Sequence, residues 1–249
     1  MGEGEYYHVG LIVEILLRLN TLQDLLVDHL IIDIHTDGMS AHHSTNTQIW
    51  PIQFRIINIG DDEPAIIGVY VSLRKPSDAM EYLKYLIEEF KSISQAGGLI
   101  ANAPARALVL NHRGHNATNP CSKCTISGQS YQRTMCFLST INEPRTYGEY
   151  YYATDKNHHL PTGESPLKHL GINMIKFVPF KYMHLICLGV MKKFLTAVID
   201  KKCKMPNLST TNIKHISDRL LTIEACCPYE SSRHPRPLED CQQYKATDF

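Results

Sequence analysis

The sequence predicts an α/β protein, and three observations lead to this fold class. Short β-branched runs follow one another between residues 29 and 73, an amphipathic helical repeat follows them, and apolar content rises again near the C-terminus. The 249 residues are 43% hydrophobic and 20% charged, which is typical of folded domains and not of disordered chains. A chain of this length is expected to form one large domain or two small ones.

The N-terminal half is predicted to begin with helix and to continue with strands. Residues 6–27 place apolar residues at helical spacing and predict one or two amphipathic helices. Three β-branched runs bounded by turn residues predict successive strands, over residues 29–36, 49–59 and 65–73. A helix is expected over residues 78–93, with Ser77 as its N-cap and Gly97-Gly98 ending it.

The second half is predicted to contain an irregular insertion and two helices. Residues 125–170 are rich in turn residues and indicate an insertion held by small helices or by a metal. Helices are expected over residues 183–199 and 207–225, the latter capped at Leu208-Ser209-Thr210. The predicted domains are an N-terminal helical segment, the first part of the core, the insertion and a C-terminal helical part, over residues 1–28, 29–124, 125–182 and 183–249.

Charge and cysteine content exclude some classes of protein. The formal net charge is zero, which argues against a general polyanion binder, although local Lys, Arg and His clusters leave a basic patch open. The N-terminus lacks the basic and apolar regions of a signal peptide, and no apolar run reaches the roughly eighteen residues of a membrane span. The eight cysteines are therefore expected to be thiols or metal ligands inside the cell, with no membrane partner.

Two local patterns predict chemistry. Asp37-Gly38 follows the first predicted strand. Three strands followed by a helix form the opening of a ribonuclease H-like fold, and other α/β folds begin in the same way. Cys121-Ser-Lys-Cys124 closes a turn-rich loop, and this spacing is typical of metal ligands or of a redox pair. Two buried thiols without a metal are the alternative interpretation of the cysteine pair.

Six sequence blocks occur in a fixed order, namely DG with QIWPI (37–38 and 48–52), IIGVYVSLRKP (66–76), APARALVLNHRGHN…CSKC (103–124), HHLPTGESPLKHL (158–170), PFKYMHLICLGVMKKFL (179–195) and RHPRPLEDCQQYKATDF (233–249). Together they resemble the catalytic region of CACTA (En/Spm-type) transposases and of transposase-derived proteins in animal genomes. The resemblance runs from Tyr6 to Phe249. It implies a ribonuclease H-like core with a zinc-stabilised insertion, a DNA partner and a nuclear location, and it leaves a homo-oligomer open.

The resemblance also implies a catalytic centre of three acidic residues that hold two Mg²⁺ or Mn²⁺ ions for attack on a DNA phosphodiester. Asp37 matches the first position, with Asp33 as the alternative. Asn102 occupies the second, and a neutral amide cannot neutralise a cation as a carboxylate does. The preceding segment is short, so its strand is expected to be missing or truncated. Asp248 is assigned to the third, where the family generally has Glu, and Lys181 stands where relatives commonly have an acidic residue.

A structural zinc site is also implied by the resemblance. Cys121 and Cys124 supply two thiolates at a suitable spacing, and His184 is the best third ligand. The fourth ligand is left open among His159, His158 and Cys187. Cys187 follows His184 by three residues, a spacing that lets both face one ion on an α-helix.

Cations that could contact DNA phosphates are scattered along the chain, and the candidates are Arg74, Lys75, Arg106, His112, Arg113, Lys192 and Lys193. Arg106 is supported by its motif, and the others are equally explained as solvated surface residues. No recognition helix is evident, so target specificity is expected to lie outside this chain.

Three functions follow from these patterns. The first is a transposase-derived protein that keeps the fold and the zinc site but is catalytically impaired. The second is an active transposase, and the third is a host-adopted module that binds DNA or protein without enzymatic chemistry. Asn102, the short segment before it and a chain that ends at the third motif, as an incomplete gene product would, favour the impaired protein.

Overall fold

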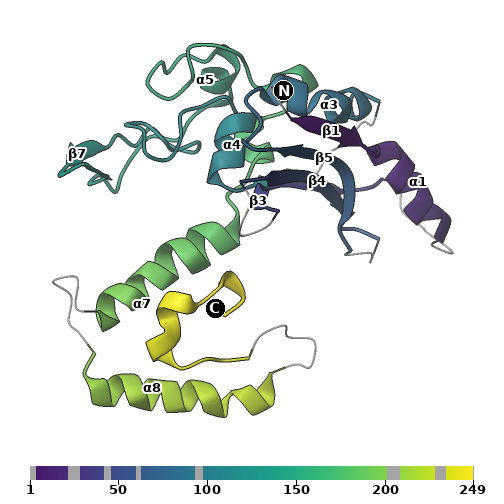
Figure 1. The fold of residues 1–249 in the computed structure, drawn as a ribbon. Helices are drawn as coiled ribbons and strands as arrows, with labels where there is room; N and C mark the ends of the chain where they lie inside the picture. The colour runs from purple at the N-terminus through teal and green to yellow at the C-terminus, as the bar shows by residue number, and fades with distance from the viewer. Residues whose placement is uncertain are drawn as a thin grey trace. The chain divides into compact units, whose positions relative to one another are not determined.

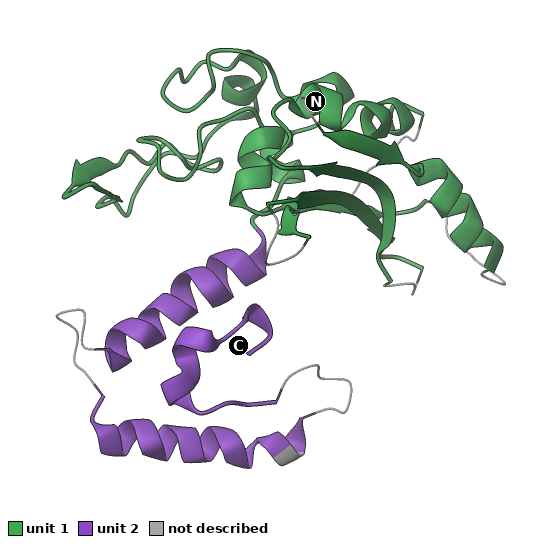
Figure 2. Ribbon diagram, viewed as in Figure 1, with its two compact units in different colours: residues 1–180 green, residues 181–249 purple. Residues whose placement is uncertain are grey.

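The structure is a computed structural model, and it describes residues 4–21, 29–41, 46–59, 63–92, 98–200, 208–227 and 234–248. The chain divides into two compact units, residues 1–180 and residues 181–249 (Figure 2). The division lies close to the predicted boundary after residue 182. The first unit contains a mixed sheet flanked by helices, which confirms the α/β class.

A sheet forms the centre of the first unit (Figure 1). Its strands are β1 (Glu5–His8), β2 (Ile32–Thr36), β3 (Met39–Ser40), β4 (Gln48–Ile56), β5 (Ala65–Ser72) and β6 (Gly98–Ala101). They lie in the order β1-β5-β4-β2-β6, with β3 paired to β4. Neighbours pair antiparallel except β2 and β6, which run parallel. The three predicted strands are confirmed as β2, β4 and β5.

The prediction of helix from residue 6 is wrong at its start. Residues 5–8 form the edge strand β1, in which Tyr6 and His8 are half-buried and their neighbours exposed. Tyr6 stacks on Tyr85, so a period of two at the sheet edge prevails over the helical spacing. Helix α1 (Leu11–Thr21) begins after Gly10, whose φ of 109° is in the glycine-favoured region. The remainder of the predicted segment, residues 22–27, lies outside the described residues.

The strand before Asn102, expected to be missing or truncated, is present but short. Residues Gly98–Ala101 form β6, which pairs in parallel register with β2. A strand of four largely buried residues is too short for periodicity to reveal, because buried parallel strands carry no alternation. On the far side of β6, Ala101 forms a parallel bridge with Phe180 at the end of the first unit.

Helices α2 (Ala79–Tyr82), α3 (Lys84–Phe90) and α4 (Ala103–Val109) contribute to one buried core with α1 and the sheet. In β2, Ile32, Ile34 and Thr36 face this core, and the Thr36 hydroxyl lies 2.7 Å from that of Tyr82. The predicted helix over residues 78–93 is thus divided at Leu83. Its N-cap is Asp78, which accepts from the Met80 N–H, and not Ser77 as predicted.

The insertion of the first unit has little regular structure, as its composition predicted. It contains the hairpin strands β7 (Gln129–Tyr131) and β8 (Thr134–Cys136), and the short helices α5 (Tyr147–Tyr152), η1 (Pro166–Leu170) and α6 (Met174–Phe177). Helix α5 begins with a capping box in which Thr146 and Glu149 bond each other's backbone N–H groups.

The second unit is helical, and its elements are η2 (Met183–Met191), α7 (Lys192–Ile199), α8 (Thr210–Thr222), η3 (Glu224–Cys226), η4 (Leu238–Gln243) and η5 (Ala246–Asp248). The predicted helix over residues 183–199 is confirmed as helical, but its first half, η2, is a π-helix. A Cβ on Gly189 would lie 2.8 Å from the His184 carbonyl oxygen, so this wider turn requires glycine there. Ser209 caps α8 within the predicted range. No helix in the described ranges is both long and apolar enough to cross a membrane.

Candidate functional site

The ends of the parallel strands β2 and β6 bring two predicted site residues together. Thr36 and Ala101 are register partners, so the residues that follow them, Asp37 and Asn102, leave the same edge of the sheet side by side. The Asn102 side-chain amide donates a hydrogen bond to Oδ1 of Asp37. The two positions that the sequence resemblance paired, 65 residues apart, are therefore in direct contact.

Both polar ends of the Asn102 side chain are engaged. As N-cap of α4, its Oδ1 accepts the Ala105 N–H at 2.9 Å. A backbone N–H can only donate, so this bond fixes the amide orientation and directs Nδ2 toward Asp37. Nδ2 has no lone pair for a metal ion. The pair formed by Asp37 and Asn102 therefore does not fit the divalent-metal centre implied by the resemblance.

The structure distinguishes Asp37 from its alternative, Asp33. Asp33 pairs in register with Gly98, at the opposite end of β6 from Asn102, about 13 Å away for four residues of strand. Its carboxylate lies 3.1 Å from the guanidinium of Arg55, its register partner on β4. The position after Asp37 is also constrained, because a Cβ on Gly38 would lie 2.5 Å from the ring of buried Trp50.

Asp248 and two of the zinc-ligand candidates, His184 and Cys187, lie in the second unit. Helix η5 packs against η2, and the Asp248 carboxylate accepts the Lys245 N–H. On η2, His184 is exposed while Cys187 is buried. The two side chains therefore do not share the face that an α-helix would give them, because a π-helix turns less per residue.

The cysteine pair forms a compact sulfur site in the first unit. The side chains of Cys121 and Cys124 are close enough for Cys121 to raise the pKa of the Cys124 thiol. The Lys123 N–H points at Cys121 Sγ over 3.4 Å, and the Ile126 N–H donates to Cys124. Burial raises the pKa of the Cys124 thiol and the Ile126 N–H opposes that shift. A pair of thiols at this spacing is the donor type that thiophilic metals bind, and the upward net shift of the Cys124 pKa means that binding would have to displace its proton.

His158 and His159 of the insertion differ in whether a ring nitrogen is available to bind a metal ion. His158 is occupied at both ring nitrogens, with Nδ1 2.7 Å from the Asn119 carbonyl and Nε2 2.6 Å from the Tyr150 hydroxyl. Nε2 of His159 is buried without a hydrogen-bond partner, so His159 is the better candidate. Within the described ranges, no three His, Cys, Asp or Glu side chains converge to hold a metal ion.

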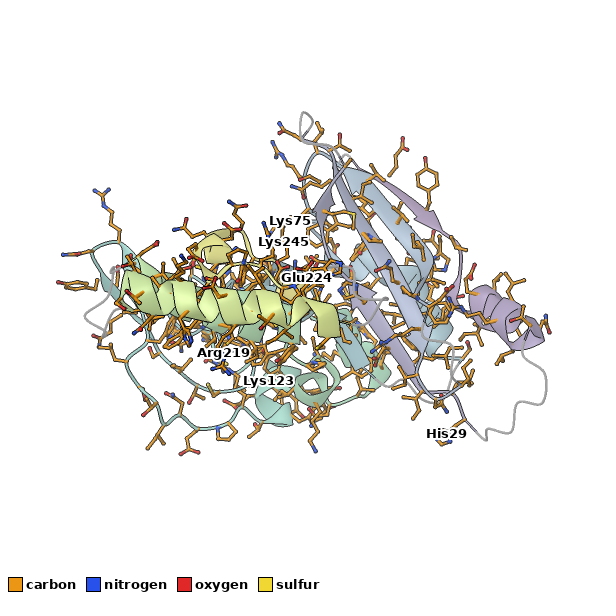
Figure 3. The ribbon with its side chains drawn as sticks, turned by 90° about the horizontal axis from the view of Figure 1, so that it is seen from below. His29, Lys75, Lys123, Arg219, Glu224 and Lys245 are labelled. Atoms are coloured by element: carbon orange, nitrogen blue, oxygen red, sulfur yellow. The ribbon has the colours of Figure 1, made fainter. Side chains whose placement is uncertain are left out.

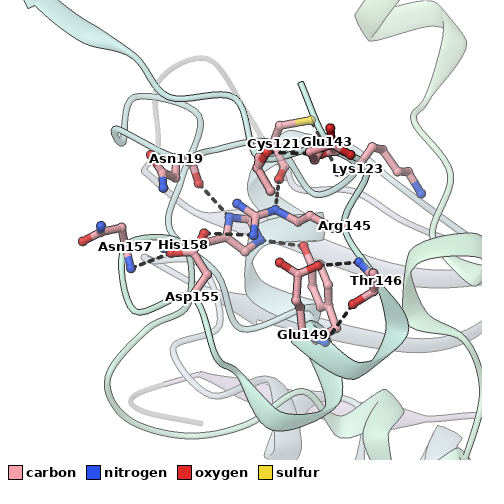
Figure 4. Close-up of polar contacts among 12 residues, drawn as sticks. Asn119, Cys121, Lys123, Glu143, Arg145, Thr146, Glu149, Asp155, Asn157 and His158 are labelled. Carbon is pink, nitrogen blue, oxygen red and sulfur yellow. Dashed lines mark hydrogen bonds and ion pairs between the residues drawn. The ribbon is translucent and has the colours of Figure 1, made fainter. Parts of the chain in front are cut away.

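A buried polar network supports the cysteine loop, and it was not predicted from the sequence (Figure 4). Arg145 donates from Nε to the Cys121 carbonyl at 2.9 Å, and its Nη1 lies 2.9 Å from the Asp155 carboxylate. Burial acts to raise the pKa of Asp155, but Arg145 and the Asn157 N–H lower it more, so its pKa falls below the ordinary value. A single Arg between turn residues carries no periodic signal, so only the structure reveals its burial.

The residues predicted to contact phosphates differ in burial and in charge. Arg106, one turn after Asn102, lies 4.4 Å from the Phe180 ring centroid. Arg113 is exposed. His112 is wrong as a cation, because its burial lowers its pKa to about 3 and leaves it neutral.

The remaining cations lie at other places in the two units. Arg74 and Lys75 are exposed after β5. In the second unit, Lys192 donates to the Tyr244 carbonyl at 2.9 Å, while Lys193 is exposed. Figure 3 shows Lys75 and Lys123 among the side chains of the first unit.

A comparison with models of known protein families found no match, and a comparison with curated proteins found no relative. The functional argument therefore depends on the strand-end pair, the sulfur pair and the distribution of charge.

Proposed function

We propose that this chain is a transposase-derived, DNA-binding protein with a ribonuclease H-like core whose two-metal centre is disabled at Asn102. The strand order supports the core. Three antiparallel strands, β2, β4 and β5, are followed by helices and by β6, which returns parallel to β2. This is the arrangement that the resemblance to CACTA transposases implies, with acidic positions at the ends of neighbouring strands. A DNA partner would place the protein in the nucleus.

The contact between Asn102 and Asp37 carries the proposal that catalysis is lost. A carboxylate at position 102 would face the Asp37 carboxylate within hydrogen-bond reach, and like charges that close require a cation or a proton between them. The amide removes this requirement because it donates directly to Asp37. Replacing one carboxylate of a two-metal centre removes ligand charge that both ions need. Divalent-metal chemistry is therefore not assigned to this pair.

The sulfur pair supports a retained structural zinc ion. Cys121 and Cys124 would bind it as thiolates, with His159 of the same unit as the best-supported further ligand. Such an ion would hold the irregular insertion, which has few hydrogen-bonded strands of its own. The proposal thus separates a structural metal from a catalytic one.

The test combines DNA binding with DNA cleavage. We expect the purified chain to shift a labelled 30-base-pair duplex in an electrophoretic assay at low salt. We expect no nicking above background when Mn²⁺ or Mg²⁺ is added. Cleavage in Mn²⁺ that is abolished by Asp37→Ala would show instead an active transposase and would overturn the proposed impairment. Failure to bind any duplex would overturn the DNA partner.

A further inference from the structure

Charge is distributed unevenly along this electrically neutral chain. Residues 90–142 contain no Asp or Glu, although acidic residues make up 25 of the 249 residues. The same 53 residues contain five cations, which are Lys91, Arg106, Arg113, Lys123 and Arg133. In the described parts of the chain, Arg106, Arg113, Lys123 and Arg133 form no ion pair with a carboxylate. Arg113 and Arg133 are exposed, whereas Arg106 is half-buried over Phe180 and the Lys123 ammonium is bonded to the Ile175 and Val178 carbonyls. The positive charge that this segment presents to solvent is therefore that of Arg113 and Arg133.

The hairpin β7–β8 extends from this acid-free segment away from the central sheet of its unit (Figure 1). Its register pairs Tyr131 with Thr134, so Gln132 and Arg133 form a two-residue turn. Both turn residues have positive φ, 47° and 64°, as a type I′ hairpin turn requires. The right-handed twist of such a turn keeps the two strands together as a narrow ribbon.

The two faces of the ribbon differ. On one face, Met135 and Phe137 lie close over Gly128, where an added Cβ would be 2.6 Å from the Phe137 ring. The opposite face presents Gln129 and Tyr131, both exposed, and Tyr131 exposes 67% of its surface. Within this hairpin the apolar side chains support the backbone, while amide, hydroxyl, phenol and guanidinium groups face solvent.

We propose that the β7–β8 hairpin enters the major groove of duplex DNA, with Arg133 at its tip and Tyr131 and Gln132 beside it. The major groove admits a two-stranded β-ribbon, and Arg and Gln side chains match the hydrogen-bonding edges of guanine and adenine. The ribbon carries no carboxylate that would repel phosphates, and exposed Arg113 lies in the same acid-free segment. This inference rests on the proposed DNA-binding function and gives the chain a base-contacting element that its sequence did not reveal.

The groove also distinguishes DNA from RNA. The major groove of an A-form RNA duplex is deep and too narrow for side chains to read, so the hairpin should not reach the bases of double-stranded RNA. A partner recognised only by charge would bind both duplexes through their phosphates. Comparing the two duplexes therefore separates groove entry from backbone attraction.

The test uses a variant that keeps the hairpin but removes its tip. Gln132→Asn with Arg133→Gly installs the dipeptide that type I′ turns prefer, so the ribbon should form at least as well as in the wild type. We expect the dissociation constant for a fluorescein-labelled 20-base-pair DNA duplex to rise about tenfold at low salt. Loss of one base-contacting Arg costs about that factor. If Arg133 also contacts a phosphate, the slope of the logarithm of affinity against the logarithm of salt concentration should fall by about one. Lys156→Ala, which removes an exposed cation outside the acid-free segment, should leave the affinity unchanged.

The outcomes distinguish the two proposals. A wild-type chain that binds DNA as tightly as the double variant would overturn the hairpin assignment and leave the DNA-binding function intact. An equal loss on an RNA duplex of the same sequence would also overturn groove entry, because it would indicate phosphate attraction alone. A wild-type chain that binds no duplex would overturn both. Unchanged thermal unfolding of the double variant confirms that the comparison is made between folded proteins.

Discussion

The strand-end pair (Asp37 and Asn102) and the sulfur pair (Cys121 and Cys124) are two possible metal positions in one unit. They differ in whether their side chains can bind a metal ion. At the strand ends, the backbone brings residues 37 and 102 together, but position 102 carries a neutral amide that is hydrogen-bonded at both ends. At the cysteine loop, two sulfurs remain adjacent and receive backbone N–H donors. Backbone geometry alone therefore does not make a metal site, because the charge and lone pairs of the side chains determine what binds.

The largest expected effect concerns the sulfur pair. Cys121→Ser should lower the zinc content of the purified protein from about one ion per chain to nearly none, because two thiolates provide half of a tetrahedral site. It should also lower the midpoint of thermal unfolding by several degrees, since structural zinc contributes directly to folding. Elemental analysis and calorimetry measure both quantities.

The matched control for the zinc prediction is Cys136→Ser. Cys136 is half-buried in β8, and its thiol lies 3.7 Å from the Thr134 carbonyl, a contact that serine can retain. Zinc content should be unchanged in this variant. Equal zinc in the wild type and in Cys121→Ser would contradict the assignment of the sulfur pair.

The next effect concerns the network behind the cysteine loop. Arg145→Leu should destabilise the protein by about 3 kcal/mol, because the buried guanidinium pairs with Asp155 and donates to the Cys121 carbonyl. The carboxylate of Asp155 is partly accessible to water, which limits the loss. Chemical denaturation measures it, and Arg74→Leu, at an exposed position, should change the free energy of unfolding by much less.

The same network predicts a pH dependence. The pKa of Asp155 is lower in the folded protein than in the unfolded chain, so its contribution to stability is full above the unfolded value of about 3.9. It is lost as the pH falls through the folded value. The difference in unfolding free energy between the wild type and Arg145→Leu should therefore narrow between about pH 4 and pH 2. A difference that stays constant over this range would show that the ion pair does not stabilise the fold.

A smaller effect concerns the strand-end pair. Asn102→Asp keeps an N-cap acceptor for Ala105 but places two carboxylates together, so it should cost about 1–2 kcal/mol at pH 7 without metal. The cost should largely disappear when Asp37→Ala is present as well, which a double-mutant cycle measures. Additive effects of the two substitutions would show that the residues do not interact.

The sequence predicted the elements that carry strong local signals. The β-branched runs became β2, β4 and β5, and Asp37 was placed correctly at the end of β2 because the Asp-Gly turn marks it. Strand β6 was missed because a short buried parallel strand shows no alternation. Strand β1 was mistaken for helix because its pairing with β5 depends on a partner 60 residues away.

The candidate site was predictable only where a single position or a short spacing carries the signal. The resemblance identified Asn102 and the cysteine spacing, which are properties of single positions. The engagement of both ends of the Asn102 amide, the burial of Arg145 and the exposure of His184 beside buried Cys187 depend on three-dimensional packing. The projecting hairpin was overlooked because Gln132-Arg133 is not one of the dipeptides that usually mark a type I′ turn.

The most direct test of the central claim is a calorimetric titration of Mn²⁺ into the zinc-loaded wild type and into Asn102→Asp. We expect no saturable binding to the wild type, because Asp37 accepts a hydrogen bond from the amide and Asn102 offers no free oxygen. We expect Asn102→Asp to bind Mn²⁺ and to lose that binding when Asp37→Asn is added. Saturable Mn²⁺ binding to the wild type that Asp37→Asn abolishes would contradict the disabled centre.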